Sequence, residues 1–131
     1  MIKLISTGKK SCPDFNAYTK RINQWKLQIL TYNKAPRYLE LIEPKKEKIV
    51  LLDERGKHMT SVQFSEFLEP NENLCFIVGA ATGFPKELFS VPHQKISLSS
   101  MTFPHELARI LLIEQIYRAQ QILRNHPYHK D

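Results

Sequence analysis

Two kinds of hydrophobic pattern alternate along the chain. Strand-like segments cover residues 2–6, 27–32, 49–52, 74–78 and 95–98, and those at 49–52 and 74–78 are continuous apolar runs, typical of strands buried in a parallel sheet. Between them, apolar residues recur at helical spacing, and a proline or capping residue begins each such segment, near residues 13, 36, 60, 85 and 102. This alternation predicts an α/β fold with a mainly parallel sheet flanked by helices. The length of 131 residues predicts a single domain over residues 1–131.

The longest predicted helix runs from Thr102 as N-cap, with Pro104 in the first turn, to about Arg124. Its apolar residues cover more than one face, whereas a surface helix needs a single stripe. They are Leu107, Ile110, Leu111, Leu112, Ile113, Ile116, Tyr117, Ile122 and Leu123. We expect one side to pack on the sheet and the other on a second subunit. A central helix in a small domain would show the same pattern.

Three apolar runs end in polar or small residues, at Leu52-Asp53, at 79–83 and at 98–102. In open parallel sheets ligands bind at the carboxyl ends of the strands, so these segments are expected to form one crevice. Gly79 and Gly83 would let a flat group approach the backbone closely. Alternatively, both glycines only make a tight turn between a strand and a helix. Their Gly-x-x-x-Gly spacing disfavours a dinucleotide fingerprint.

Charge, cysteine spacing and hydropathy indicate the partner and the location to expect. Nineteen Lys and Arg against thirteen Asp and Glu give a net charge of +6, which favours a polyanionic partner such as nucleic acid. Cys12 and Cys75 have the spacing of neither a disulfide scaffold nor a metal site. The sequence contains no apolar run of membrane-spanning length and no signal-peptide core, so we expect a cytoplasmic protein without a membrane partner.

Polar residues cluster towards the C-terminus. Glu114 and Arg118 are four residues apart in the order that favours a helical ion pair, and burial at a subunit contact is the alternative. The tail His126-Pro127-Tyr128-His129-Lys130 combines an aromatic ring, two imidazoles and positive charge. Such a tail could clamp a phosphate, stack on a base or bind a metal. A metal is disfavoured, because no third or fourth ligand is evident.

The segments LSSMTFPHELARILLIEQIYRA and NHPYHK, at residues 98–119 and 125–130, resemble the C-terminal signature of the RlmH-type ribosomal RNA methyltransferases. These are SPOUT-class enzymes that use S-adenosylmethionine. The resemblance implies a deep trefoil knot in the C-terminal half and a homodimer whose tail closes over the partner's cofactor. Carried over by position, it implies cofactor contacts at Leu52, Gly79, Leu98, Ser99, Ser100, Met101, Thr102 and Phe103, and it implies no metal.

The same resemblance implies methyl transfer to N3 of a pseudouridine in 23S ribosomal RNA on the assembled ribosome. It assigns the reaction centre to Arg118, Tyr128 and His129. We expect His129 to take the N3 proton, Arg118 to stabilise charge on the base and Tyr128 to position it. Two departures stand out: Ala80 replaces the usual second glycine and is followed by the unusual pair Ala81-Thr82, and the first half is abbreviated around residues 34–48. A catalytically silent protein that binds RNA or the ribosome is therefore the alternative.

Overall fold

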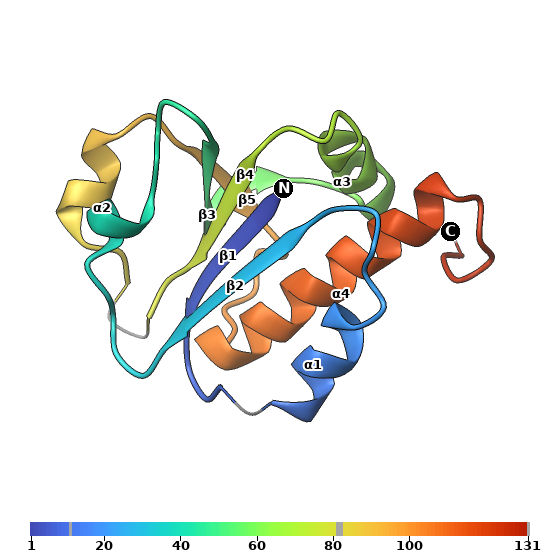
Figure 1. Ribbon diagram of the computed structural model, residues 1–131, viewed down its shortest axis with the longest axis horizontal. Helices are drawn as coiled ribbons and strands as arrows, with labels where there is room; N and C mark the ends of the chain where they lie inside the picture. Colours follow the sequence, from blue (N-terminus) through green and yellow to red (C-terminus); the bar gives the residue numbers. More distant parts are fainter. Residues whose placement is uncertain (11, 81–82, 131) are drawn as a thin grey trace.

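A computed structural model of the chain describes residues 1–10, 12–80 and 83–130. Its five strands form one sheet in which every neighbouring pair is parallel, in the order β2-β1-β4-β3-β5. The strands are β1 (Ile2–Thr7), β2 (Leu27–Tyr32), β3 (Lys48–His58), β4 (Leu74–Val78) and β5 (Gln94–Ser97). The predicted α/β fold with a parallel sheet is confirmed (Figure 1).

Helices cover both faces of this sheet. The helices α1 (Pro13–Thr19), α3 (Ser61–Leu68) and α4 (His105–Leu123) pack on one face, and α2 (Tyr38–Leu41) with the 3-10 helix η1 (Lys86–Ser90) packs on the other (Figure 1). A hydrophobic core lies on each face of the sheet. On β3, Val50 packs into the core on the α4 side, and Ile49 and Leu51 pack into the core on the α2 side. This double burial explains why the central strands read as continuous apolar runs. No helix of the described residues is long and apolar enough to cross a membrane.

The start of α3 follows the predicted capping box. The Thr60 side chain accepts a hydrogen bond from the Gln63 backbone, and the Gln63 side chain accepts one from Thr60 N–H. The start of α4 differs from the prediction. Thr102 is not its N-cap, because the Thr102 hydroxyl donates to Oε2 of Glu54 at 2.5 Å. The helix begins two residues later with Pro104 as the N-cap residue, so the placement of Pro104 inside the first turn was also wrong.

The predicted end of the third strand at Leu52-Asp53 is wrong as well. β3 continues to His58, and both Leu52 and Lys57 pair with Ile96 of β5. The register between β3 and β5 therefore shifts across segment 53–56. Gly56 permits this, because a Cβ there would lie 2.6 Å from the Lys95 backbone. Hydropathy could not predict the extension, since its residues are polar and pair through the backbone. The knot implied by the resemblance stays a prediction.

Helix α4 packs against several elements of its own chain. It contacts α1, α3, β1 and β4, and the side chains of Leu112, Ile113, Ile116 and Ala119 are fully buried. These contacts account for much of its apolar surface, as in the expected alternative of a central helix. Leu107 near its start remains 43% exposed, and the second-subunit contact stays a prediction.

Candidate active site

Arg118 and Glu114 form an ion pair one turn apart on α4. Nη2 and Nε of Arg118 each lie 2.8 Å from Oε1 of Glu114. Only 24% and 15% of the two side-chain surfaces are exposed, respectively. The hydrogen bond to Glu114 raises the pKa of Arg118 above its ordinary value. The predicted helical ion pair is therefore confirmed.

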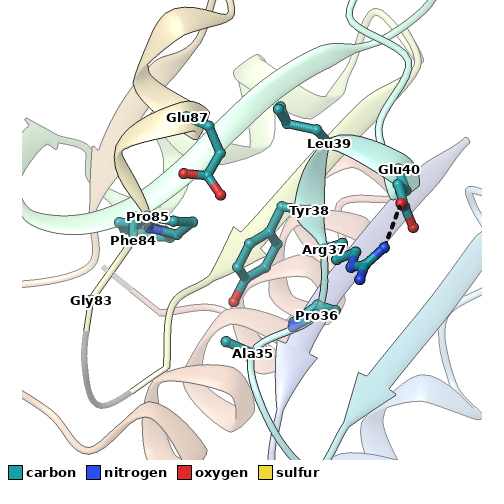
Figure 2. A pocket seen from close by; sticks show the side chains of 10 residues that line it. All are labelled: Ala35, Pro36, Arg37, Tyr38, Leu39, Glu40, Gly83, Phe84, Pro85 and Glu87. Atoms are coloured by element: carbon teal, nitrogen blue, oxygen red, sulfur yellow. Dashed lines mark hydrogen bonds and ion pairs between the residues drawn. The ribbon is translucent and has the colours of Figure 1, made fainter.

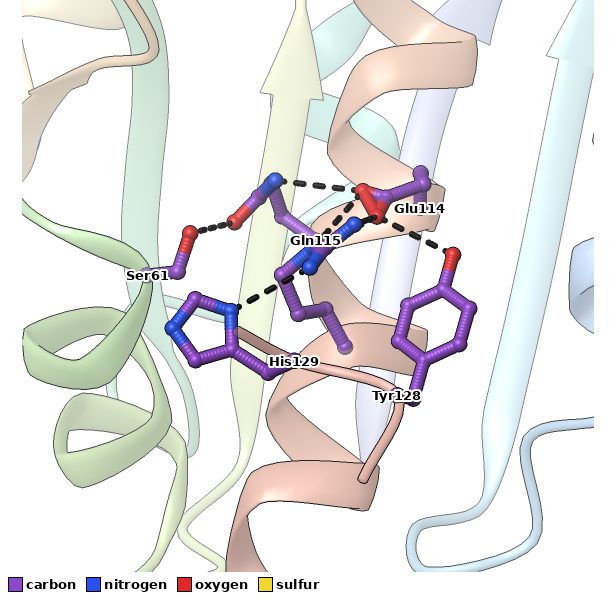
Figure 3. A network of polar contacts seen from close by, with 6 residues as sticks. Ser61, Glu114, Gln115, Tyr128 and His129 are labelled. Atoms are coloured by element: carbon purple, nitrogen blue, oxygen red, sulfur yellow. Dashed lines mark hydrogen bonds and ion pairs between the residues drawn. The ribbon is translucent and has the colours of Figure 1, made fainter. Parts of the chain in front are cut away.

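The tail after α4 folds back onto this ion pair. Nη1 of Arg118 lies 3.2 Å from Nδ1 of His129, and its guanidinium carbon lies 4.7 Å from the centre of the Tyr128 ring. The Tyr128 hydroxyl donates to Oε1 of Glu114 at 3.4 Å. The structure thus brings the three predicted catalytic residues together, with Arg118 and Tyr128 on the Glu114 carboxylate and His129 on Arg118 (Figure 3).

Tyr128 is held as a neutral phenol. Its ring makes an edge contact with Tyr117, with 4.9 Å between ring centres. Burial, followed by the nearby Glu114 carboxylate, raises the pKa of Tyr128 to about 12. At physiological pH the hydroxyl is therefore a hydrogen-bond donor.

Sequence reasoning missed two residues of this network, Ser61 and Gln115. The Ser61 hydroxyl donates to Oε1 of Gln115 at 2.7 Å, and Nε2 of Gln115 donates to Oε2 of Glu114 at 3.1 Å (Figure 3). A glutamine on an apolar helix was a weak signal for a polar contact. No pattern in the sequence could pair it with a serine 54 residues away.

The predicted convergence of strand ends follows from the register. Leu52 lies opposite Val78 at the end of β4 and opposite Ile96 near the end of β5. Gly79 and Leu98 are the residues that follow these two strands. Leu52, Gly79 and Leu98 therefore share one edge of the sheet, where ligands bind in open parallel sheets.

A cavity of about 240 Å³ lies beside this edge, between β5, α3 and α4. Leu98, Ser99 and Phe103 line it from the predicted cofactor segment, and Ser61 and Gln115 line it from the hydrogen-bonded network. The remaining lining is mostly apolar and comprises Met59, Thr60, Phe64, Ile96, Ser97 and Leu111. The cavity thus adjoins both the strand ends and the polar chain that leads to the tail.

The other predicted cofactor residues do not line this cavity. Ser100, Met101 and Thr102 are exposed to solvent, Met101 by 70%. Gly79 faces Phe84, because a Cβ on Gly79 would lie 3.1 Å from the Phe84 ring. Within one chain, the eight predicted contacts therefore do not form one pocket.

The structure shows whether the backbone at Ala80 requires a glycine. Ala80 is not among the residues with positive φ, so its methyl group adds no backbone strain. Gly83 does have a positive φ of 86°, and its N–H donates to the Ala80 carbonyl at 2.9 Å. Ala81 and Thr82 lie outside the described residues.

The described part of the chain contains no group of three His, Cys, Asp or Glu side chains that could hold a metal ion. In the tail, Nδ1 of His126 accepts a hydrogen bond from the Tyr128 backbone at 3.1 Å. His129 contacts Arg118 instead. The two tail histidines, His126 and His129, thus form hydrogen bonds with different residues.

Fold and site together define an α/β protein with a candidate ligand site at the carboxyl edge of a parallel sheet. The chain matches the family described as "Predicted SPOUT methyltransferase" over residues 1–129, and it belongs to that family. It is 33% identical over 136 residues to "Ribosomal RNA large subunit methyltransferase H" of Bacteroides thetaiotaomicron, a match that covers 90% of this chain and 87% of the relative. The resemblance to RlmH-type proteins is confirmed.

Two further comparisons show how far the similarity extends. The protein of the same name from Synechococcus sp. (strain CC9311) is 53% identical over 83 residues, which cover 62% of this chain and 58% of that relative. The matched segment thus spans less than two thirds of that relative. The structure of a probable methylase family protein from Haemophilus influenzae Rd KW20 matches with a TM-score of 0.55 at 10% identity, over 99% of this chain and 70% of that one. This last match supports the fold alone.

Proposed function

We propose that the protein is a ribosomal RNA large-subunit methyltransferase that uses S-adenosylmethionine. The observation that carries the proposal is the cluster in which Arg118 contacts Glu114, Tyr128 and His129, in a chain of a methyltransferase family. Relatives named as ribosomal RNA methyltransferases support the substrate class. The net charge of +6 is suited to a polyanionic substrate.

The residues at the sheet edge are suited to S-adenosylmethionine, which SPOUT methyltransferases generally use and which supplies an electrophilic methyl group. Leu98 and Phe103 offer apolar surface to an adenine ring, and Ser99 offers a hydroxyl. Gly79 and Leu52 would contribute backbone at the neighbouring strand ends. Ser100, Met101 and Thr102 complete the proposed set.

Proton removal is assigned to His129. N3 of a pseudouridine carries a proton that must leave before the nitrogen can attack a methyl group, so a base within hydrogen-bond reach is needed. Nδ1 of His129 is an unprotonated acceptor where Arg118 donates to it. If Arg118 turns to an oxygen of the bound base, Nδ1 is released to accept the N3 proton and the guanidinium stabilises the charge that develops.

Tyr128 and Glu114 orient these groups. The Tyr128 ring lies against the Arg118 guanidinium, and its hydroxyl is held by Glu114. Tyr128 therefore restricts where Arg118 can move and presents a flat ring on which the target base could stack. The target in this proposal is N3 of a pseudouridine in 23S ribosomal RNA on assembled ribosomes, and the place of action is the cytoplasm.

A homodimer completes the proposed site. α4 has nineteen residues and is therefore about 28 Å long, and residues 98–103 precede it whereas the tail follows it. Two antiparallel copies of α4 would bring the tail of one protomer to segment 98–103 of the other. The exposed apolar side chains of Met101 and Leu107 at the start of α4 provide surface for such a contact.

Isothermal titration with S-adenosylmethionine tests the cofactor assignment first. We expect saturable binding, with the number of sites per dimer reported by the stoichiometry. A folded protein that binds none at millimolar cofactor, with or without ribosomes, would favour the silent RNA-binding alternative. Ser99→Trp, which fills the cavity beside β5, should abolish the heat of binding, whereas the exposed substitution Lys45→Ala should leave it unchanged.

A further inference from the structure

A second cavity, of about 520 Å³, lies on the opposite face of the sheet from α4. The segment after β2 forms one wall with Ala35, Pro36 and Tyr38, and the segment after β4 forms the other with Gly83, Phe84 and Pro85. Figure 2 shows the Tyr38 ring on the first wall, facing Phe84 and Pro85 of the second, with its hydroxyl directed towards Ala35. The Arg118 cluster and the cavity beside β5 share no residue with it.

Tyr38 carries an unusual hydroxyl. The residue is only 2% exposed, and its Oη is buried without a hydrogen-bond partner in the described structure. Burial raises the pKa of Tyr38, so the group remains a neutral donor. A buried hydroxyl without a partner destabilises a folded protein, and such groups are rare unless a ligand or water satisfies them. The Tyr38 hydroxyl therefore points to a bound molecule that offers an acceptor.

The shape and charge of the walls indicate the class of that molecule. Phe84 and two prolines, all partly exposed, present flat or rigid apolar surfaces, which suit a planar ring. The charged side chains of the lining are Arg37, Glu40 and Glu87, and Arg37 is already paired with Glu40 at 3.5 Å. A phosphate would meet one more acidic than basic group here. The cavity is thus suited to a base and unsuited to a phosphate.

Its location connects the cavity to the proposed active site. Phe84 packs against Gly79, where a Cβ would lie 3.1 Å from the ring. One wall of the cavity therefore rests directly on the end of β4, where the cofactor contact at Gly79 is proposed. A group bound in this cavity would lie next to the sheet edge that carries the chemistry.

We propose that this cavity binds a nucleobase of the RNA substrate, with Tyr38 Oη as the hydrogen-bond donor and Phe84 as the stacking surface. The inference rests on the proposed function for the identity of the RNA. An adenine from the cofactor has the same ring chemistry, so the experiment separates these two sources.

The test compares the wild type with Tyr38→Phe, which removes only the hydroxyl. The probe is uridine, which carries a base but no phosphate, and binding is followed by chemical-shift changes in NMR spectra. We expect the dissociation constant for uridine to rise about tenfold in Tyr38→Phe, which corresponds to the loss of about one hydrogen bond. The melting temperature should stay the same or rise, because the variant removes a buried hydroxyl without a partner. Tyr32→Phe, at a partly buried tyrosine packed against the same core but outside the cavity lining, should change neither quantity.

A blocking variant and a second ligand complete the test. Ala35→Phe, at an exposed residue of the wall, should abolish uridine binding in a folded protein. S-adenosylhomocysteine should bind Tyr38→Phe and the wild type equally. The proposal is overturned if uridine does not bind, if Tyr38→Phe binds it as well as the wild type, or if the loss affects the cofactor analogue instead. Uridine binding is measured without methyl transfer. A protein that binds no uridine could therefore still be the proposed methyltransferase, and a protein without methyltransferase activity could still bind uridine.

Discussion

Arg118 donates a hydrogen bond from Nη1 to Nδ1 of His129 across 3.2 Å. A guanidinium has no acceptor, so the direction of this bond is fixed, and in a neutral His129 ring the proton lies on Nε2. The lone pair of Nδ1 is then the one that accepts the Arg118 hydrogen bond. If His129 is the base, as we propose, Nδ1 is the atom that takes the proton, and Arg118 has to move away from it first.

The substitution His129→Gln removes that basic nitrogen and retains hydrogen-bonding groups of similar reach. We predict that the rate constant of methyl transfer falls by about 100-fold or more, the usual contribution of a general base, while cofactor affinity and melting temperature are unchanged. Single-turnover methylation of ribosomes measures the rate. His126→Gln serves as the control and should keep full activity, because His126 is exposed and a glutamine oxygen can replace Nδ1 as acceptor for the Tyr128 N–H. Full activity in His129→Gln would remove the base assignment.

Glu114→Gln tests whether the carboxylate orders the cluster. The change keeps the shape of the side chain but removes the charge that pairs with Arg118 and contributes to the raised pKa of Tyr128. We predict that the pKa of Tyr128 falls part of the way from about 12 towards its ordinary value of 10.0, because burial is retained. The Tyr128 ring-carbon signal in an NMR titration reports this pKa. An unchanged pKa would contradict the contact with Glu114.

Cys75 gives a pH dependence with a defined sign. Burial, followed by the nearby charge of Glu47 and opposed by Lys3, raises the pKa of the Cys75 thiol from 9.0 to about 12. The unfolded chain loses this proton near pH 9, whereas the folded chain keeps it. The thiol therefore favours the folded state below pH 9, and this contribution is lost as the pH rises from 9 to 12.

We accordingly predict that the free energy of unfolding falls more steeply between pH 9 and 12 in the wild type than in Cys75→Val, as measured by urea titration. In the native protein at pH 8, a thiol reagent should modify the partly exposed Cys12 and leave the fully buried Cys75 intact until the chain unfolds. Rapid modification of both thiols in the native protein would contradict the buried environment.

Leu107→Glu tests the proposed dimer. Leu107 is 43% exposed near the start of α4, so a charge there should cost little in the isolated chain but should repel a second copy. We predict a shift from dimer to monomer in sedimentation analysis, with a loss of methyl transfer and a retained circular dichroism spectrum. Lys86→Glu on η1, on the other face of the sheet, should leave the dimer intact. A wild type that sediments as a monomer even with cofactor and ribosomes would contradict this part of the account.

Much of the fold could be predicted from the sequence because burial on both faces leaves a clear apolar signal. The run at 74–78 coincides with the fully buried strand β4, and the segment 27–32 coincides with β2, which is only partly buried. The extension of β3 through Gly56 was missed because its polar residues pair through backbone groups, which hydropathy does not report. Thr102 was misplaced because its hydroxyl binds Glu54, 48 residues away, instead of capping a helix.

The candidate site could be predicted only in part from the sequence. The resemblance in the tail named Arg118, Tyr128 and His129, and the structure brings them together. It gave no indication of Ser61 or of the unpartnered Tyr38 hydroxyl. Both depend on tertiary contacts between segments that carry no recognisable motif.

Methyl transfer to ribosomes tests the central claim most directly. Assembled ribosomes that lack the modification would be incubated with the protein and S-adenosylmethionine carrying a labelled methyl group, and the label would be mapped by mass spectrometry of the 23S RNA. The account predicts one methyl group per large-subunit RNA, on N3 of a pseudouridine, and none with His129→Gln. A folded, cofactor-binding protein that transfers no methyl group to ribosomes or their RNA would contradict it.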